Sequence, residues 1–172
     1  LYMTMVHSHI RATAAYAAGP ADTLLIVNDS LVEKSDSDMF VSVFLGFLES
    51  DIGLLNYANA GHDPPFLRRH TGEIDRLVRT GPILGVFEEI TLVDKTAKLD
   101  PGDALLAYTD GVTDALNSAG EEYGTLRFLD IVRRTTGTAG HYLAKIEADL
   151  SAFIGHELQT DDVTLLAIKA YA

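Results

Sequence analysis

Aspartates stand at the ends of two apolar, strand-like segments, and their type and spacing could support chemistry. Asp110 follows an apolar run and precedes Gly111, a residue that lets backbone and ligand approach closely. Asp161 and Asp162 stand directly before the closing apolar segment 163–169. If the two strands are neighbours in a sheet, these carboxylates converge. Converging carboxylates, in a chain without cysteine or a paired histidine, suit a hard divalent ion such as Mg²⁺ or Mn²⁺.

The same aspartates could instead cap the segments that follow them, which aspartate does readily. Asp114 and Glu121 add negative charge nearby, so the residues alone leave both roles open. A nucleophilic role for Asp110 is not supported, because the D-x-D pattern of haloacid-dehalogenase-type phosphatases is interrupted by Val112. A receiver domain would need an acidic pair after its first strand, well upstream, and this pattern does not fit either.

The elements that must position these residues follow in the order helices, strands, helices, strand. Helices are expected over 2–18 and 21–34, separated by Gly19 and Pro20, with a polar loop at 35–38. Strands are then expected over 40–49, 54–60, 65–69, 73–77, 90–99 and 104–109. Helices over 125–135 and 139–158 precede the last strand at 163–169. This order predicts an α+β layered sandwich with mostly antiparallel sheet.

Composition narrows the class of protein. The 172 residues are enough for one domain with a real core. The formal net charge of −12, from 25 acidic and 13 basic residues, argues against nucleic-acid binding, and the pairs Arg68-Arg69 and Arg133-Arg134 are typical of solvated edges. No apolar run approaches the roughly 18 to 20 residues of a membrane span. The absence of cysteine excludes disulfides and thiolate metal sites and fits a cytoplasmic protein.

Four motifs occur in order along the chain, and their sequences can be compared with a known family. They are YANAGHDPP at 57–65, GPILGV at 81–86, LLAYTDGVTDA at 105–115 and DDVTLLAI at 161–168. The ordered set resembles the metal-dependent protein serine/threonine phosphatases of the RsbU/SpoIIE type, within the PPM superfamily. The resemblance implies an α-β-β-α sandwich, with a two-metal site at one sheet edge.

The resemblance also implies roles for individual residues. Asp110 and Asp161 match the family's metal-ligating aspartates, while Asp162 and Gly111 would support them without contacting the metal. Two Mn²⁺ or Mg²⁺ ions in the intact domain would activate a water for direct hydrolysis. The implied substrate is phosphoserine or phosphothreonine on a regulatory protein such as an anti-sigma-factor antagonist, with an upstream sensor domain as a further partner.

One departure from the family pattern concerns the start of the chain. The family's earlier D-x-x-G-H-G motif, which supplies a bridging aspartate, has no counterpart here. We therefore expect residues 1–172 to form a single phosphatase domain that lacks its N-terminal strands and holds two metals poorly. The unpaired sheet edges this would leave predict a homodimer. The alternative is a non-catalytic regulatory module that keeps the fold. A generic α+β binding domain would explain neither the aspartates nor the ordered motifs.

Other polar residues have plainer explanations. His62 could donate a proton to a leaving alkoxide, but the sequence around it favours a histidine that holds a tight turn. His7 and His9 stand two residues apart on an expected helix and so point to different faces. Asn28 and Asp29 fall where the family carries regulatory helices, and a solvated helical face is the simpler prediction for both.

Overall fold

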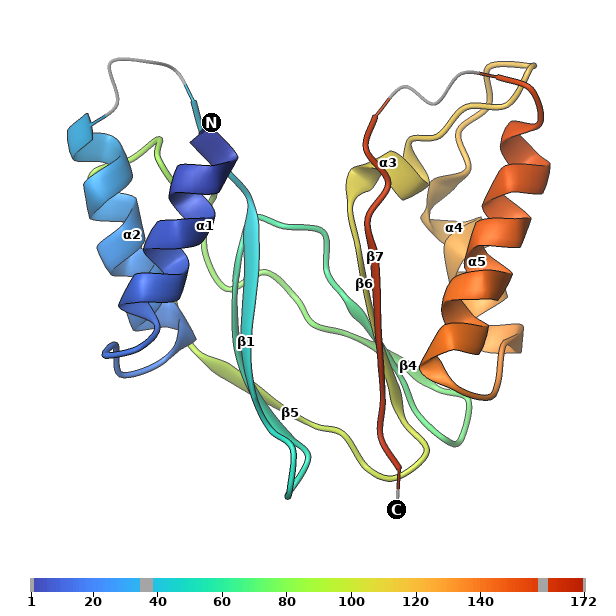
Figure 1. Cartoon of the computed structure of the whole chain (residues 1–172), viewed down its shortest axis with the longest axis horizontal. Coiled ribbons are helices and arrows are strands. Elements are labelled where there is room, and N and C mark those ends of the chain that lie inside the picture. The colour runs from blue at the N-terminus through green and yellow to red at the C-terminus, as the bar shows by residue number, and fades with distance from the viewer. Residues whose placement is uncertain (1, 35–38, 158–160, 172) are drawn as a thin grey trace. The chain divides into compact units, whose positions relative to one another are not determined.

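The computed structural model describes residues 2–34, 39–157 and 161–171. Contacts divide the chain into two compact units, each made of two chain segments. The first unit comprises Leu1–Pro64 and Leu77–Lys98, and the second comprises Pro65–Arg76 and Leu99–Ala172. Figure 1 shows helices beside a sheet in each unit.

The first unit is a three-stranded antiparallel sheet with two helices packed on it. Its strands lie in the order β1-β2-β5, and β2 pairs with both neighbours. The elements are α1 (Tyr2–Thr13), α2 (Pro20–Lys34), β1 (Val43–Glu49), β2 (Leu54–Ala60) and β5 (Lys95–Lys98). Leu24, Val27 and Leu31 form a fully buried stripe on α2, as the helical spacing predicts. The small side chains of Ala58 and Ala60 on β2 belong to the same core.

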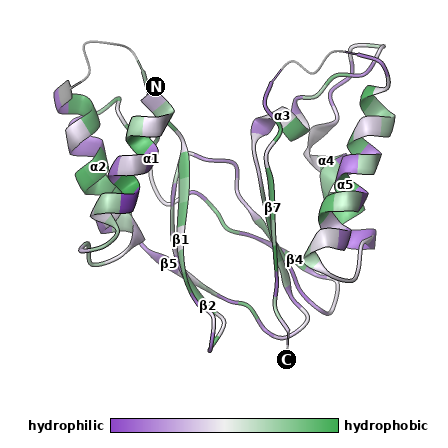
Figure 2. Ribbon diagram, in the orientation of Figure 1, coloured by the Kyte–Doolittle hydropathy of each residue, from purple (hydrophilic) through white to green (hydrophobic). Residues whose placement is uncertain are grey.

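The second unit is a four-stranded antiparallel sheet in the order β4-β3-β6-β7. Its elements are β3 (Phe66–Arg68), β4 (Ile74–Arg76), β6 (Ala104–Tyr108), α3 (Asp110–Thr113), α4 (Gly124–Arg134), α5 (Ala139–Ile154) and β7 (Leu165–Lys169). Three aromatic rings lie in the core of this unit. Phe66 and Tyr108 on the sheet each contact Phe128 on α4, and their ring centroids lie 5.7 and 4.6 Å, respectively, from the Phe128 ring centroid. Figure 2 shows hydrophobic and hydrophilic faces side by side on the helices of both units.

The predicted α+β class with antiparallel sheet is confirmed, although several boundaries differ from those expected. The first helix ends at Thr13 rather than at 18, because the chain turns there and the Asp22 carboxylate accepts a hydrogen bond from the Ala18 N–H. The strand expected over 90–99 is reduced to β5, since Asp94 instead accepts a hydrogen bond from the Ala21 N–H at the start of α2. The short helix α3 was not predicted, and α5 ends at Ile154.

Some expectations fall on residues outside the described ranges. They are the polar loop at 35–38 and the end of the helix predicted to reach 158. Among the helices in the described ranges, none is long and apolar enough to cross a membrane.

Candidate metal centre

The ends of β6 and β7 bring the two aspartate segments together. The strands pair antiparallel, with Tyr108, the last residue of β6, opposite Leu165, the first residue of β7. Asp110 lies just after this pair along the chain and Asp161 just before it, so both lie at the same edge of the sheet. The aspartates can converge only if these strands are neighbours, and the strand order β4-β3-β6-β7 shows that they are.

Thr109 ties the two segments together beyond the strand ladder. Its main-chain N–H donates to the Thr164 carbonyl at 3.1 Å. Its hydroxyl donates to the Asp162 carbonyl at 3.0 Å and accepts from the Thr164 N–H at 2.9 Å. One residue therefore fixes the main chain on either side of Val163.

Gly111 lies against the main chain that carries Asp162. A Cβ atom added at Gly111 would lie 2.5 Å from the Asp162 carbonyl oxygen and 2.9 Å from its carbonyl carbon. Real side chains do not approach that closely, so this contact requires glycine. The close approach that the sequence suggested at this glycine is therefore an approach of two main-chain segments.

The two carboxylates are exposed, and each accepts a local hydrogen bond. The Gly111 N–H donates to Asp110 Oδ1 at 3.0 Å, and the Asp162 N–H donates to Asp161 Oδ1 at 2.7 Å. Asp110 begins the four-residue helix α3, whose N-cap is Thr109. These bonds orient the carboxylates at the sheet edge without removing them from water. Thr109, and not Asp110, is the N-cap of α3, and among the described residues the Asp110 carboxylate accepts only from the next residue, so Asp110 does not cap this helix.

The other two acidic residues that the sequence places nearby, Glu121 and Asp114, both have local partners. Glu121 accepts a hydrogen bond from Asn117 Nδ2 at 2.9 Å and lies 3.8 Å from an Arg127 nitrogen. Asp114 accepts from the Thr113 hydroxyl at 3.2 Å. Within the described ranges, no three His, Cys, Asp or Glu side chains gather closely enough to hold a metal ion. The oxygens of Asp110 and Asp161 are of the type that a hard divalent cation prefers.

His62 lies in the first unit, in a turn held by several hydrogen bonds. Its N–H donates to Asn59 Oδ1 at 2.9 Å, and its Nδ1 lies 3.1 Å from the Ser42 hydroxyl. Asn59 is fully buried, and its Nδ2 donates to the Leu77 carbonyl at 3.2 Å. This arrangement agrees with the plainer explanation, a histidine within a tight turn.

Asn28 is the clearest correction to the sequence analysis. The prediction of a solvated position was wrong, because the side chain is fully buried. Its Oδ1 accepts from the Gly85 N–H and its Nδ2 donates to the Phe87 carbonyl, both at 3.0 Å. Asn28 thus attaches α2 to the end of the GPILGV motif and to Phe87 directly after it. Its neighbour Asp29 is exposed, as predicted.

His7 and His9 stand two residues apart on α1 and differ in burial. His7 is exposed and His9 is half-buried.

Asp103 is a fully buried charge in the turn before β6. Its carboxylate accepts from Arg69 Nη1 and from the His70 N–H, both at 2.8 Å, and from the Asp100 N–H at 3.1 Å. Burial alone would raise the pKa of the Asp103 carboxyl, but these hydrogen bonds and the Arg69 charge outweigh burial and lower the pKa. Asp103 therefore anchors the turn before β6, at the strand end opposite Asp110.

Two proteins with curated names are similar in sequence to this chain. Protein IcfG of Synechocystis is 35% identical over 144 residues, which are 83% of this chain and 23% of that protein. Phosphoserine phosphatase RsbU of Bacillus subtilis is 25% identical over 121 residues, which are 70% of this chain and 36% of RsbU. The chain thus spans less than two fifths of the length of either relative.

A solved structure shares the fold of this chain, and a family model matches its sequence. The SiaA-PP2C domain of Pseudomonas aeruginosa shares the fold with a TM-score of 0.77 at 20% identity, over 96% of this chain and 69% of that one. This likeness is consistent with the predicted α+β sandwich. Among other structures of this fold, the phosphatase domain of SpoIIE from Bacillus subtilis was solved after presoaking with Mn, and RsbX was solved in complex with magnesium. The family model described as Stage II sporulation protein E (SpoIIE) matches residues 1–171. The chain therefore belongs to the SpoIIE family of PP2C-type phosphatase domains, as its motifs predict.

Proposed function

We propose that this chain carries part of the catalytic centre of a metal-dependent protein phosphatase, with Asp110 and Asp161 as metal ligands. The observation that supports the proposal is the junction of β6 and β7, where Thr109 and Gly111 hold the two aspartate segments against each other. Carboxylate oxygens at adjacent strand ends match the ligand preference of Mn²⁺ and Mg²⁺. The remaining ligands would be waters and groups outside these two segments.

The chain's own residues would do the positioning. Asp110 and Asp161 would supply two negative charges to hold a cation, and their hydrogen bonds to neighbouring N–H groups fix one oxygen of each carboxylate. A bound divalent cation would neutralise phosphoryl oxygens and lower the pKa of an attacking water. Asp162 and Gly111 would act through the main chain, by setting the separation of the two aspartates.

The proposed substrate is phosphoserine or phosphothreonine on a regulatory protein. The printed name of RsbU, a phosphoserine phosphatase, supports this substrate class. The chain has no cysteine for a thiolate nucleophile, and Asp110 lacks the D-x-D pattern of an aspartyl-phosphate enzyme. Direct attack by water, without a covalent phospho-enzyme, is therefore the proposed reaction.

A test of the metal ligands should read binding separately from turnover. We would add Mn²⁺ to the ¹⁵N-labelled chain and follow paramagnetic broadening of the amides around Asp110 and Asp161. Asp110→Asn should weaken Mn²⁺ binding about a hundredfold or more, since even indirect partners of metal ligands cost about 10–100-fold. Asp100→Asn is the matched control, because Asp100 is exposed and precedes β6 at its opposite end.

Turnover is measured on the protein extended upstream of this chain, because residues 1–172 alone are expected to hold two metals poorly, and the substrates are p-nitrophenyl phosphate and a phosphoserine peptide. We expect Mn²⁺-dependent hydrolysis that Asp110→Asn abolishes and Asp100→Asn preserves. Equal broadening in the parent chain and in Asp110→Asn would refute the ligand assignment. Specific broadening without turnover would instead favour the non-catalytic regulatory module.

A further inference from the structure

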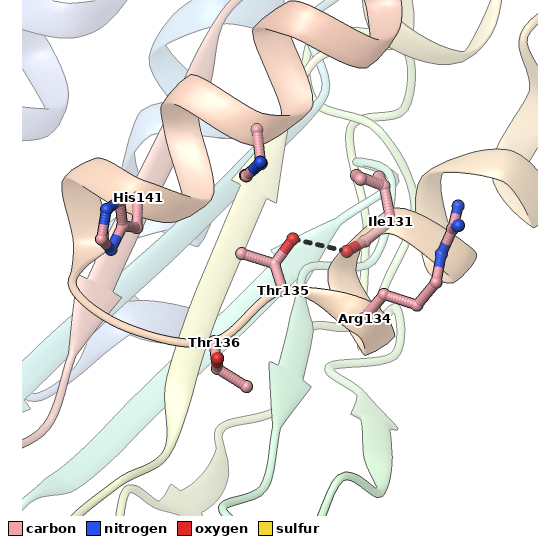
Figure 3. Close-up of a pocket in the computed structure, with 6 residues that line it drawn as sticks. Ile131, Arg134, Thr135, Thr136 and His141 are labelled. Carbon is pink, nitrogen blue, oxygen red and sulfur yellow. Dashed lines mark hydrogen bonds between the residues drawn. The ribbon is translucent and has the colours of Figure 1, made fainter.

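A pocket in the second unit lies where α4 ends and α5 begins. Its volume is about 310 Å³, at the lower end of the range of roughly 300–1,000 Å³ typical of small-ligand sites. The residues that line it are Ile131, Arg134, Thr135, Thr136, His141 and Lys145. Figure 3 shows Thr135 and Thr136 on the connection between the helices, with Arg134 and His141 on either side.

The charge of this region is opposite to that of the chain. The chain has a formal net charge of −12, yet residues 131–146 contain three Lys or Arg residues and a histidine and no acidic residue. Asp130 and Glu147 are the acidic residues that bound this stretch. A cationic depression on an acidic surface gathers anions locally.

The basic side chains of the pocket differ in whether an acidic side chain pairs with them. Arg134 forms an ion pair with Asp130, with 2.7 Å between Nη2 and Oδ2. Lys145 and His141 are exposed, and their side chains have no hydrogen-bond or ion-pair partner among the residues that the structure describes. The uncompensated positive charge of the pocket is therefore centred on Lys145.

The loop between the helices places donors around that charge. Gly137 adopts a positive φ of 115°, and a Cβ atom there would lie 2.5 Å from His141 Nδ1, so the imidazole folds closely over the loop. Thr135 is buried and donates its hydroxyl to the Ile131 carbonyl at 2.7 Å, which fixes the loop to α4. Thr136 beside it is exposed. The start of α5, a helix of 16 residues, adds the positive end of its dipole.

We propose that this pocket binds a phosphate group, with Lys145 as the charged contact and Thr136 and His141 as hydrogen-bond donors. Ammonium, imidazole and hydroxyl donors that approach from α5 and from the loop before it suit an oxyanion with several acceptor oxygens. The phosphate could be free inorganic phosphate or one carried by a phosphorylated peptide, and both present the same chemistry. The proposal goes beyond the phosphatase function and does not depend on Asp110 or Asp161.

The test is an NMR titration of the ¹⁵N-labelled chain in metal-free buffer at constant ionic strength. Three ligands are compared: inorganic phosphate, a phosphoserine peptide and the same peptide without phosphate. We expect saturable shifts of the Thr136, Gly137 and His141 amides with a phosphate-bearing ligand and none with the unphosphorylated peptide. Shifts with inorganic phosphate would identify the free anion as sufficient, and shifts with the phosphopeptide alone would identify a protein-borne group.

Two single substitutions separate a pocket from a merely basic surface. Lys145→Gln should raise the dissociation constant about fivefold, the upper end for an exposed charge pair. Arg133→Gln should change it less than about twofold at physiological salt, because exposed charges outside direct contact are screened. Arg133 is exposed and adjacent to Arg134 but does not line the pocket. Equal effects of both variants, or no saturable shift with either phosphate-bearing ligand, would overturn the proposal.

Discussion

Replacing Gly111 by alanine tests whether contact between main-chain segments holds the aspartates together. The new Cβ would meet the Asp162 carbonyl oxygen at 2.5 Å and its carbon at 2.9 Å. Both atoms belong to the main chain, which cannot rotate away as a flexible side chain could. The segment before β7 must therefore shift, or the start of α3 must.

The size of the effect follows from two opposing terms. Gly111 lies inside α3, where alanine is favoured over glycine by about 1 kcal/mol. Forcing an extra carbon into a packed contact costs typically about 1–3 kcal/mol, and a rigid main-chain neighbour places this case near the upper end. We expect Gly111→Ala to lower the free energy of unfolding by about 1–2 kcal/mol.

A matched control is Gly140, which lies on helix α5 of the same unit. A Cβ at Gly140, in the first turn of α5, would meet nothing nearer than 3.9 Å. Gly140→Ala should therefore raise the free energy of unfolding by about 0.5–1 kcal/mol. Urea denaturation followed by circular dichroism measures both variants against the parent. If Gly111→Ala is as stable as Gly140→Ala, the steric argument at the β6–β7 junction is refuted.

Three further substitutions test buried polar contacts by the same urea assay. Asp103→Asn should cost about 2–3 kcal/mol at neutral pH, because it removes a charge hydrogen-bonded to Arg69. The pKa of Asp103 is lowered from 3.8 in the folded state, so its contribution is full above that pH and is lost as the pH falls through the folded pKa; the variant should lack this acid-dependent loss. Asn28→Ala should cost about 1–3 kcal/mol and speed amide exchange at Gly85, since it leaves two main-chain groups unpaired. Tyr123→Phe should cost about 1.5–3 kcal/mol by removing a 2.6 Å hydrogen bond to the Asp149 carboxylate, and an unchanged denaturation midpoint would contradict that estimate.

The sequence predicts strand ends at both aspartate segments, but it gives the pairing of β6 with β7 only as a condition. An apolar run ended at Asp110 and another began after Asp161, and the order of elements favoured antiparallel sheet. The Thr109 hydrogen bonds could not be predicted, since a threonine after a strand has many possible partners. The metal role of the aspartates, the single domain over 1–172 and the homodimer remain predictions.

The burial of Asn28 can be predicted from its position on α2. The buried residues of α2 include Leu24, Val27 and Leu31, and position 28 falls on the same face at helical spacing. A polar residue on that face must be buried and hydrogen-bonded. For Asp103 no comparable signal exists, because its partner Arg69 stands 34 residues away in the chain.

The segment 90–98 shows how packing can override local pattern. The apolar residues at 90–93 have the composition of a strand, yet the ladder forms over Lys95–Lys98. A Cβ at Gly81 would lie 2.4 Å from a Leu92 methyl carbon and 2.5 Å from the Thr91 carbonyl oxygen. Thr91 and Leu92 thus pack tightly against Gly81 without pairing with β2.

The hydrogen bonds of Thr109 have a thermodynamic consequence for any cation at this edge. They join residues 53 and 55 positions apart, so the paired carboxylates exist only after the β6–β7 pair has closed a long loop. A cation that needs both carboxylates binds the folded chain and not the unfolded one. Its binding free energy then adds to the stability of the fold, by about 2.7 kcal/mol at a hundred times the dissociation constant. The melting temperature of the second unit would therefore rise with cation concentration, whether or not any substrate is turned over.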